Sequence, residues 1–164
     1  MDALSVSTVI SKPREEVFEY LADIANHAEF TDHYLVDWHL TREESYGTGA
    51  GARFRIKAPF ARFSWADMTF TTLDPPFRIV EHGRGGKYNR IRMLGTYTLE
   101  DGPDQSTNVQ YQLETRPVQP SDRLLEALGG RAWTRRQTSK AMRRLRAILE
   151  GDAEPGPRPS VSGR

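Results

Sequence analysis

Residues 120–150 read PSDRLLEALGGRAWTRRQTSKAMRRLRAILE and form the only long stretch of the chain with a helical pattern. At about 100° per residue, one face of this helix carries a defined set of side chains. The set consists of Thr134, Thr138, Ala141, Met142, Leu145, Ile148 and Leu149. This face is strongly apolar only toward its C-terminal end, whereas its first turns present Arg131, Thr134 and Thr138. The pattern predicts a helix that packs against a sheet at one end and borders a cavity at the other.

The region before this helix has the two-residue period of β-strands. Strands are expected there over residues 34–41, 52–58, 63–73, 77–83, 89–100 and 107–115. Turn sequences such as Gly47–Gly51 separate them, and the short connections favour antiparallel pairing. A further strand over 4–10 precedes Pro13, which suits a helix start, and a second short helix is expected over 23–30. The predicted class is therefore α+β.

Length and composition limit the possible classes of protein. A chain of 164 residues has room for one domain, which we place at residues 1–150, and the Pro- and Gly-rich residues 151–164 are expected to be disordered. No apolar run of about eighteen residues is present, so no membrane span is expected. The first residues lack a secretory signal pattern, which makes a cytoplasmic location the expectation. The absence of cysteine excludes disulfides and thiol nucleophiles.

Charge is distributed unevenly along the chain. Residues 121–150 carry eight lysines and arginines against three acids, a net +5, whereas residues 1–120 carry thirteen against seventeen, a net −4. A basic helix of this kind could dock on an anionic membrane surface, RNA or an acidic protein, although a solvated outer face is the more common meaning. Its single aromatic residue, Trp133, gives little support for base stacking, and no DNA partner is expected.

Several short segments resemble one known superfamily. They are VSTVISKP at residues 6–13, Glu16-Val17-Phe18, Leu21-Ala22-Asp23, Leu73-Asp74-Pro75-Pro76 and Arg78-Ile79-Val80, together with the closing helix. Over residues 3–150 the chain resembles the START-like superfamily, which includes birch-pollen-allergen-like proteins and bacterial polyketide cyclase/dehydrase and lipid-transport proteins. It departs from the common pattern at Phe30, where the family usually has tryptophan.

The resemblance implies a helix-grip fold, in which a curved seven-stranded antiparallel sheet surrounds the long C-terminal helix and two short helices follow the first strand. A cavity would lie between the concave face of the sheet and these helices. Members of the superfamily bind sterols, lipids, polyketides or plant hormones, and only some are enzymes. The resemblance is therefore more specific for fold than for function.

Side chains that share the inward face define the expected cavity wall. Strand 63–73 is ambiguous, because either Met68 and Phe70 or the alternating set with Trp65 faces inward; we favour Met68 and Phe70. Core packing is the alternative for most of the wall, but several large aromatic residues beside Thr134 and Thr138 favour a cavity. The expected wall consists of Trp38, Phe54, Ile56, Met68, Phe70, Met93, Tyr97, Tyr111, Leu113, Arg131, Thr134, Thr138 and Met142.

Two candidates for chemistry lie on neighbouring strands. His82 shares its parity with Val80, which would place the imidazole inside the sheet, where it could exchange protons near the Tyr97 phenol. The other register of strand 77–83 would place Ile79 and Glu81 inside instead. Parity alone leaves both registers open.

Arg131 is the third candidate for chemistry. Its guanidinium could meet a carboxylate, phosphate or enolate oxygen at the cavity mouth, or it could extend into water. The preceding Gly129-Gly130 pair could let the helix start flex, or it could end a short preceding helix. The four histidines lack the spacing of a metal site and no nucleotide-binding glycine motif is present, so neither a metal nor a cofactor is expected.

Three functions remain open from the sequence. The first is binding or transport of a small hydrophobic molecule, such as a lipid, a polyketide or a similar ring compound, in an internal cavity. The second is a polyketide cyclase or dehydratase type of enzyme, which requires at least two polar groups at one depth, and the sequence shows no such pair clearly. The third is docking through the basic helix. The chain is expected to be a monomer or a homodimer.

Overall fold

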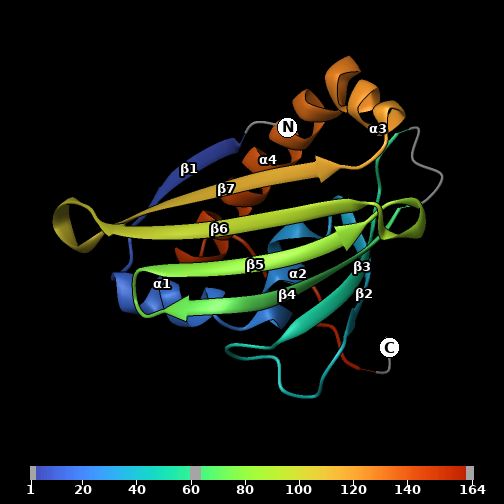
Figure 1. Cartoon of the computed structure of the whole chain (residues 1–164). Coiled ribbons are helices and arrows are strands. Elements are labelled where there is room, and N and C mark those ends of the chain that lie inside the picture. The colour runs from blue at the N-terminus through green and yellow to red at the C-terminus, as the bar shows by residue number, and fades with distance from the viewer. Residues whose placement is uncertain (1–2, 60–63, 162–164) are drawn as a thin grey trace.

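A single curved antiparallel sheet organises the fold. The computed structural model describes residues 3–59 and 64–161, and within them the strand order is β1-β7-β6-β5-β4-β3-β2 in a seven-stranded sheet (Figure 1). The first strand therefore pairs with the last one, and β2 forms the other edge. The strands are β1 (Leu4–Ile10), β2 (Leu35–Leu40), β3 (Gly51–Ile56), β4 (Trp65–Asp74), β5 (Arg78–Gly85), β6 (Ile91–Asp101) and β7 (Thr107–Pro117). The predicted seven-stranded antiparallel sheet is confirmed. The first residue of the expected strand 63–73 lies outside the described residues.

Two short helices follow β1 and cover part of the concave face. Helix α1 (Arg14–Leu21) begins after Pro13, whose extended backbone suits the entry to a helix, and α2 (Ile24–Thr31) begins at Asp23. The Asp23 carboxylate accepts a hydrogen bond from the Ala25 N–H at 3.0 Å, which satisfies one free donor of the first turn. Helix α1 buries its Val17, Phe18 and Leu21 side chains against the sheet.

The C-terminal block divides into three pieces. Helix α3 (Pro120–Leu125) is followed by a wide turn, η3 (Glu126–Gly130), and then by the long helix α4 (Arg131–Leu149). Gly129 interrupts the helix with φ of 132°, a conformation that side chains with a Cβ rarely adopt. The glycine pair therefore ends the preceding helical segment, and the long helix starts at Arg131. In Figure 1, α4 crosses behind the sheet and α3 lies beyond the end of β7.

The apolar half of α4 packs into the main core. Ala141, Met142 and Leu145 are all less than 4% exposed and join a cluster with residues of α1, α2 and the concave face of the sheet. Phe18 and Phe30 are the largest side chains from the two short helices in this cluster. The sequence pattern predicted this packed end of the helix, and the buried set agrees with it.

The register of β4 and β5 decides which side chains enter the concave side. Met68 and Phe70 face inward, as we favoured, and Trp65 is on the outer face. Phe70 lies directly opposite Glu81 in the ladder, so Glu81 shares the inward face, while His82 is exposed on the outer face. The inward placement of His82 was therefore wrong. The alternative register holds, and Glu81 lies inside.

Residues 151–161 differ from the expected disordered tail, since they lie along α2 and the outer edge of β2. The Leu40 N–H donates to the Ser160 carbonyl at 3.0 Å, and Arg158 forms an ion pair with Asp23 at 2.8 Å. The free edge of β2 and the acidic start of α2 provide partners that composition does not reveal. Residues 162–164 of the expected tail lie outside the described part of the chain. Among the described residues, no helix is both long and apolar enough to cross a membrane.

Candidate functional site

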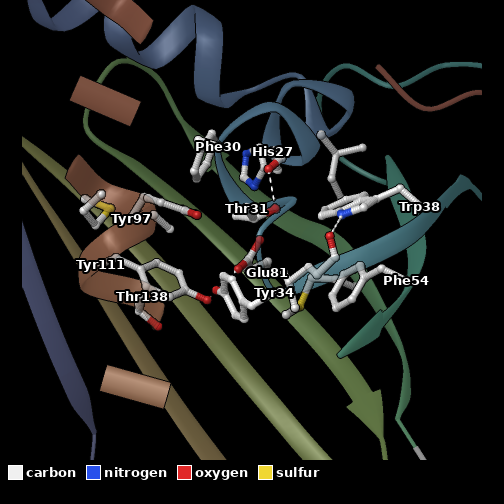
Figure 2. A pocket seen from close by; sticks show the side chains of 15 residues that line it. His27, Phe30, Thr31, Tyr34, Trp38, Phe54, Glu81, Tyr97, Tyr111 and Thr138 are labelled. Carbon is white, nitrogen blue, oxygen red and sulfur yellow. Dashed lines mark hydrogen bonds between the residues drawn. The ribbon is translucent and has the colours of Figure 1, made fainter. Parts of the chain in front are cut away.

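A small, partly open cavity, which we call the inner chamber, lies between the concave face of the sheet, α2 and the middle of α4. Its volume is about 50 Å³. Figure 2 shows side chains from both helices and from the sheet pointing into it. The lining residues are Ile24, His27, Phe30, Thr31, Tyr34, Leu35, Trp38, Phe54, Met68, Glu81, Tyr97, Tyr111, Thr138, Ala141 and Met142. Most are apolar or aromatic, and none is a lysine or arginine.

Glu81 is the only carboxylate among the described residues that line the inner chamber. It is 3% exposed, and the Tyr111 hydroxyl donates a hydrogen bond to its Oε1 at 2.9 Å. Burial raises the pKa of Glu81 from 4.5 to about 7, and the hydrogen bond from Tyr111 acts in the opposite direction. Near neutral pH this group can therefore hold or release a proton inside an apolar cavity.

A glycine on the neighbouring strand makes room for this pair. Gly95 of β6 lies opposite Glu81 in the ladder. A Cβ at position 95 would come within 2.5 Å of Glu81 Oε1 and 2.8 Å of the Tyr111 hydroxyl oxygen. Any larger residue would therefore displace one of the two polar groups. A glycine inside a strand often marks such a close approach.

Three further hydroxyl groups belong to this polar region. Figure 2 shows Tyr34 and Tyr97 beside the carboxylate, and Thr138 further out, beyond Tyr111. Burial raises the pKa of Tyr34 to about 12, with Thr138 acting in the opposite direction, and burial beside Glu81 raises the pKa of Tyr97 further above its usual value. The Thr138 hydroxyl is 3% exposed and has no hydrogen bond of acceptable geometry to any described residue. We call Glu81, Tyr111, Tyr97, Tyr34 and Thr138 the polar centre.

His27 forms another part of the chamber wall. Its Nε2 lies 2.8 Å from the Leu21 carbonyl oxygen, and because a carbonyl only accepts, Nε2 carries the hydrogen. Burial lowers the pKa of His27 to about 4, so the ring is neutral at physiological pH. The ring also contacts Phe30, Phe70 and Tyr97, with centroids 5.3, 5.3 and 5.4 Å away. His27 is a neutral, fixed side chain in this position.

A second hollow, the outer groove, lies at the end of the molecule where α3, η3 and the start of α4 meet the ends of the strands. Its volume is about 250 Å³. Its lining residues are Ile56, Ala58, Pro59, Ile91, Thr115, Asp122, Leu125, Glu126, Gly130, Arg131, Trp133 and Thr134. Some of the polar lining residues form ion pairs or hydrogen bonds. Asp122 pairs with Arg90 at 3.8 Å, and the Thr115 hydroxyl donates a hydrogen bond to Glu126.

The structure divides the predicted cavity wall into three groups. The inner chamber contains Trp38, Phe54, Met68, Tyr97, Tyr111, Thr138 and Met142. The outer groove contains Ile56, Arg131 and Thr134. The remaining three face inward but pack as core: Phe70 is fully buried, Met93 packs against Phe54 and Met68, and Leu113 packs against the main cluster. Arg131 and Tyr97 therefore lie in different hollows, and His82 lies in neither of them.

Sequence reasoning left eight of the chamber's lining residues out of the predicted wall, and three of them, Glu81, Tyr34 and His27, matter most for its chemistry. The inward placement of Glu81 was left open as one of two possible registers of strand 77–83. Tyr34 and His27 were not assigned to the wall. Tyr34 lies in the turn just before β2, although the expected strand 34–41 already gives it the same face as Trp38. His27 lies on a helix whose residues are all buried, so a helical period does not single it out. Gly95 was the available signal for Glu81, because an isolated glycine in a strand points to a bulky neighbour.

The basic face of α4 is partly used for internal contacts. Arg144 contacts Asp32 and donates to the Glu29 carbonyl at 3.2 Å, and Arg146 pairs with Glu150 at 3.3 Å. These side chains hold α4 to α2 and to its own C-terminus. Docking of this helix on a membrane, RNA or an acidic protein stays a prediction. Within the described ranges, no group of three or more histidine, aspartate or glutamate side chains could hold a metal ion.

Solved structures share this fold at low sequence identity. The protein TTHA0849 from Thermus thermophilus aligns with a TM-score of 0.71 at 13% identity, over 93% of this chain and 99% of that chain. The KanY protein aligns with a TM-score of 0.74 at 13% identity, over 91% and 97% of the two chains. DynU16, from the dynemicin biosynthetic locus, aligns with a TM-score of 0.61 at 20% identity, over 92% of this chain and 48% of that chain. At these identities the likeness establishes the fold.

None of the curated proteins matches the chain. The sequence does match one protein family, described as polyketide cyclase / dehydrase and lipid transport, over residues 1–150. The match spans the sheet, both short helices and the long helix that enclose the inner chamber. The chain belongs to the polyketide cyclase / dehydrase and lipid transport family.

Proposed function

We propose that this protein binds a small, largely apolar molecule of the polyketide type, with an oxygen atom of that molecule held by the polar centre of the inner chamber. The observation that carries the proposal is Glu81, a buried carboxyl surrounded by hydroxyl groups inside an otherwise apolar cavity. The family match supports this class of ligand, and so does the biosynthetic-locus origin of the structural relative DynU16.

The chemistry of the wall limits what the ligand carries. Apolar burial contributes roughly 25 cal/mol per Å² of ligand surface, so most of the affinity comes from rings or alkyl groups. The polar centre fixes orientation, because a ketone accepts from a tyrosine or threonine hydroxyl and a ligand hydroxyl donates to Glu81. No lysine or arginine is among the described residues that line the chamber, and Glu81 repels anions when it is charged. A carboxylate or phosphate at the inner end is therefore disfavoured.

A second candidate function is catalysis by the same groups, and the pairing of Glu81 with Tyr111 favours it. A carboxylate with a pKa near 7 is suited to removing a proton from the carbon beside a ketone. The electron pair forms an enolate, whose oxygen the Tyr97 or Tyr34 hydroxyl stabilises by a hydrogen bond. The enolate carbon then forms a bond to a second carbonyl carbon of the same molecule, and Glu81 returns the proton to the resulting alkoxide. This intramolecular aldol step needs no cofactor.

The test separates binding from catalysis with two substitutions at one position. Gently purified protein is examined by native mass spectrometry, any bound molecule is extracted and identified, and 2-acetonaphthone serves as the supplied probe. We expect Glu81→Leu to weaken binding at least tenfold, while Glu100→Gln, on the exposed face of β6, leaves binding unchanged. If the protein is an enzyme, Glu81→Gln keeps binding and abolishes the intramolecular aldol turnover of a supplied diketone, a step that 2-acetonaphthone with its single carbonyl group cannot undergo. Unchanged binding in Glu81→Leu would contradict both functions.

A further inference from the structure

The inner chamber alone is too small for the ligands that the proposed function requires. Its volume of about 50 Å³ is well below the roughly 150 Å³ of a cavity that holds benzene and the ~300–1,000 Å³ of typical ligand pockets. A molecule that reaches Glu81 therefore needs additional space. The outer groove, at about 250 Å³, offers it nearby.

The two hollows follow one another along the same elements. On β3, Phe54 lines the chamber, and Ile56, which lies two residues further on the same face, lines the groove. On α4, Thr138 lines the chamber and Thr134, one turn earlier, lines the groove. A strand face and a helix face thus run continuously from Glu81's surroundings to the outside.

An aromatic pair stands where the hollows meet. Tyr34 lines the chamber, Trp133 lines the groove, and their rings contact edge to face with centroids 6.0 Å apart and an interplanar angle of 76°. Neither ring belongs to the sheet. Tyr34 lies in the turn between α2 and β2, and Trp133 lies in the first turn of α4, just after Gly129 with its φ of 132°. The two rings can therefore separate without breaking a strand pairing.

We propose that Tyr34 and Trp133 form a gate and that the outer groove is the second compartment of the ligand site. This inference rests on the proposed function and extends it. The ligand is an elongated molecule: its oxygen-bearing end reaches the polar centre, and its apolar chain or far ring lies against Ile56, Ile91 and Leu125 in the groove. Charges of both signs border the groove, from Arg131, Asp122 and Glu126, so the groove has no excess of positive charge for an anionic group.

The test uses phenol and 4-alkylphenols from ethyl to hexyl as probes, with calorimetry on the full chain. We expect the affinity of the wild-type chain to rise about fourfold for each added methylene, the value for full apolar burial. Ala58→Trp, which fills the groove, removes this dependence on chain length, because the alkyl chain then has no space beyond the chamber. The matched control is Lys57→Trp, because Lys57 is exposed and outside the groove lining. An equal effect of the two variants would overturn the second compartment.

The gate is tested by a separate measurement, the rate at which a ligand associates with the protein. Trp133→Ala should speed the association of 4-hexylphenol about tenfold in stopped-flow measurements, whereas Trp65→Ala, on the outer face of β4, should leave the rate unchanged. If Ala58→Trp does not fold, 5-fluorotryptophan NMR of the wild-type chain replaces it. Butyl and longer phenols should then shift the Trp133 signal and not the Trp65 signal, and equal shifts would overturn the proposal.

Two failures can be told apart by the shortest and longest probes. If phenol binds and Glu81→Leu weakens it, but the affinity of the wild-type chain does not change with chain length, the proposed function stands and the outer compartment is wrong. If no probe of any length binds, or if Glu81→Leu has no effect on phenol, the proposed function itself fails.

Discussion

The two halves of α4 meet the same sheet in different ways. The C-terminal half inserts Leu145 into the core, with Ile148 and Leu149 packed against it, whereas the N-terminal half presents Thr138, Thr134 and Arg131 to two hollows. Packing at one end fixes the helix axis, so the other end can leave space beside the sheet. The comparison teaches that a cavity in this fold depends on a neighbouring region where packing is complete.

The first prediction concerns the two halves directly. Leu145→Ala should reduce the free energy of unfolding by about 2–5 kcal/mol, because it leaves a void in a fully buried site. Thr138→Val keeps the shape of the side chain and removes a buried hydroxyl without a good hydrogen bond, so its cost should stay below about 1 kcal/mol. Urea denaturation measures both. Equal losses for the two variants would show that the halves do not differ.

The second prediction concerns the polar centre and pH. Glu81 binds its proton more tightly in the folded chain, since its pKa rises from 4.5 to about 7. Its contribution to stability is therefore complete below about pH 4.5 and decreases as the pH rises toward 7, by roughly 3 kcal/mol at most. The stability of the wild-type chain relative to Glu81→Gln should fall over this range.

The comparison with Glu81→Gln is needed because His27 acts in the opposite direction. Its pKa is lowered from 6.5 to about 4, so the folded chain loses stability as the pH falls through that interval. The difference between the two chains removes this contribution, which both share. A difference that does not change between pH 4.5 and 8 would mean that Glu81 is hydrated, and its burial in the chamber would then be wrong.

The third prediction concerns residues 151–161, which pack against α2 and the edge of β2. Deleting residues 154–164 removes the Leu40–Ser160 hydrogen bond and the Arg158–Asp23 ion pair, so we expect a loss of about 1–2 kcal/mol and a lower melting temperature. Arg158→Ala should give part of this loss, and Glu154→Ala, which is exposed, should give none. A truncated chain as stable as the full chain would restore the expectation of a disordered tail.

The fourth prediction has the smallest effect on stability. Tyr97→Phe keeps the ring contact with Tyr111, whose centroid lies 4.5 Å away, and removes one hydroxyl from the polar centre. Folding stability should change by less than about 1 kcal/mol, while ligand affinity or turnover changes clearly. Thermal unfolding and probe binding are measured on the same samples. A large stability loss without an effect on the ligand would place Tyr97 among the structural core residues.

The sequence predicted the sheet and the two-sided character of α4 because both follow from local periods. The face of β4 was also predicted correctly, through Met68 and Phe70. The position of Glu81 could not be predicted from a strand period alone. It depends on which residue of β4 lies opposite it, and the ladder shifts register between Phe70 and Thr72. The docked tail depends on tertiary contacts with a strand edge, for which the sequence has no period.

The central claim is that the hollow half of the molecule holds a carboxyl group away from water. The most direct measurement is the pKa of Glu81, followed by carbon-13 NMR of the glutamate side-chain carboxyls from pH 3 to 9, with Glu81→Gln to assign the signal. The structure predicts a midpoint of about 7, with no change to the other glutamate signals in the variant. A midpoint near the ordinary value of 4.5 would contradict the claim, because Glu81 would then be in contact with water.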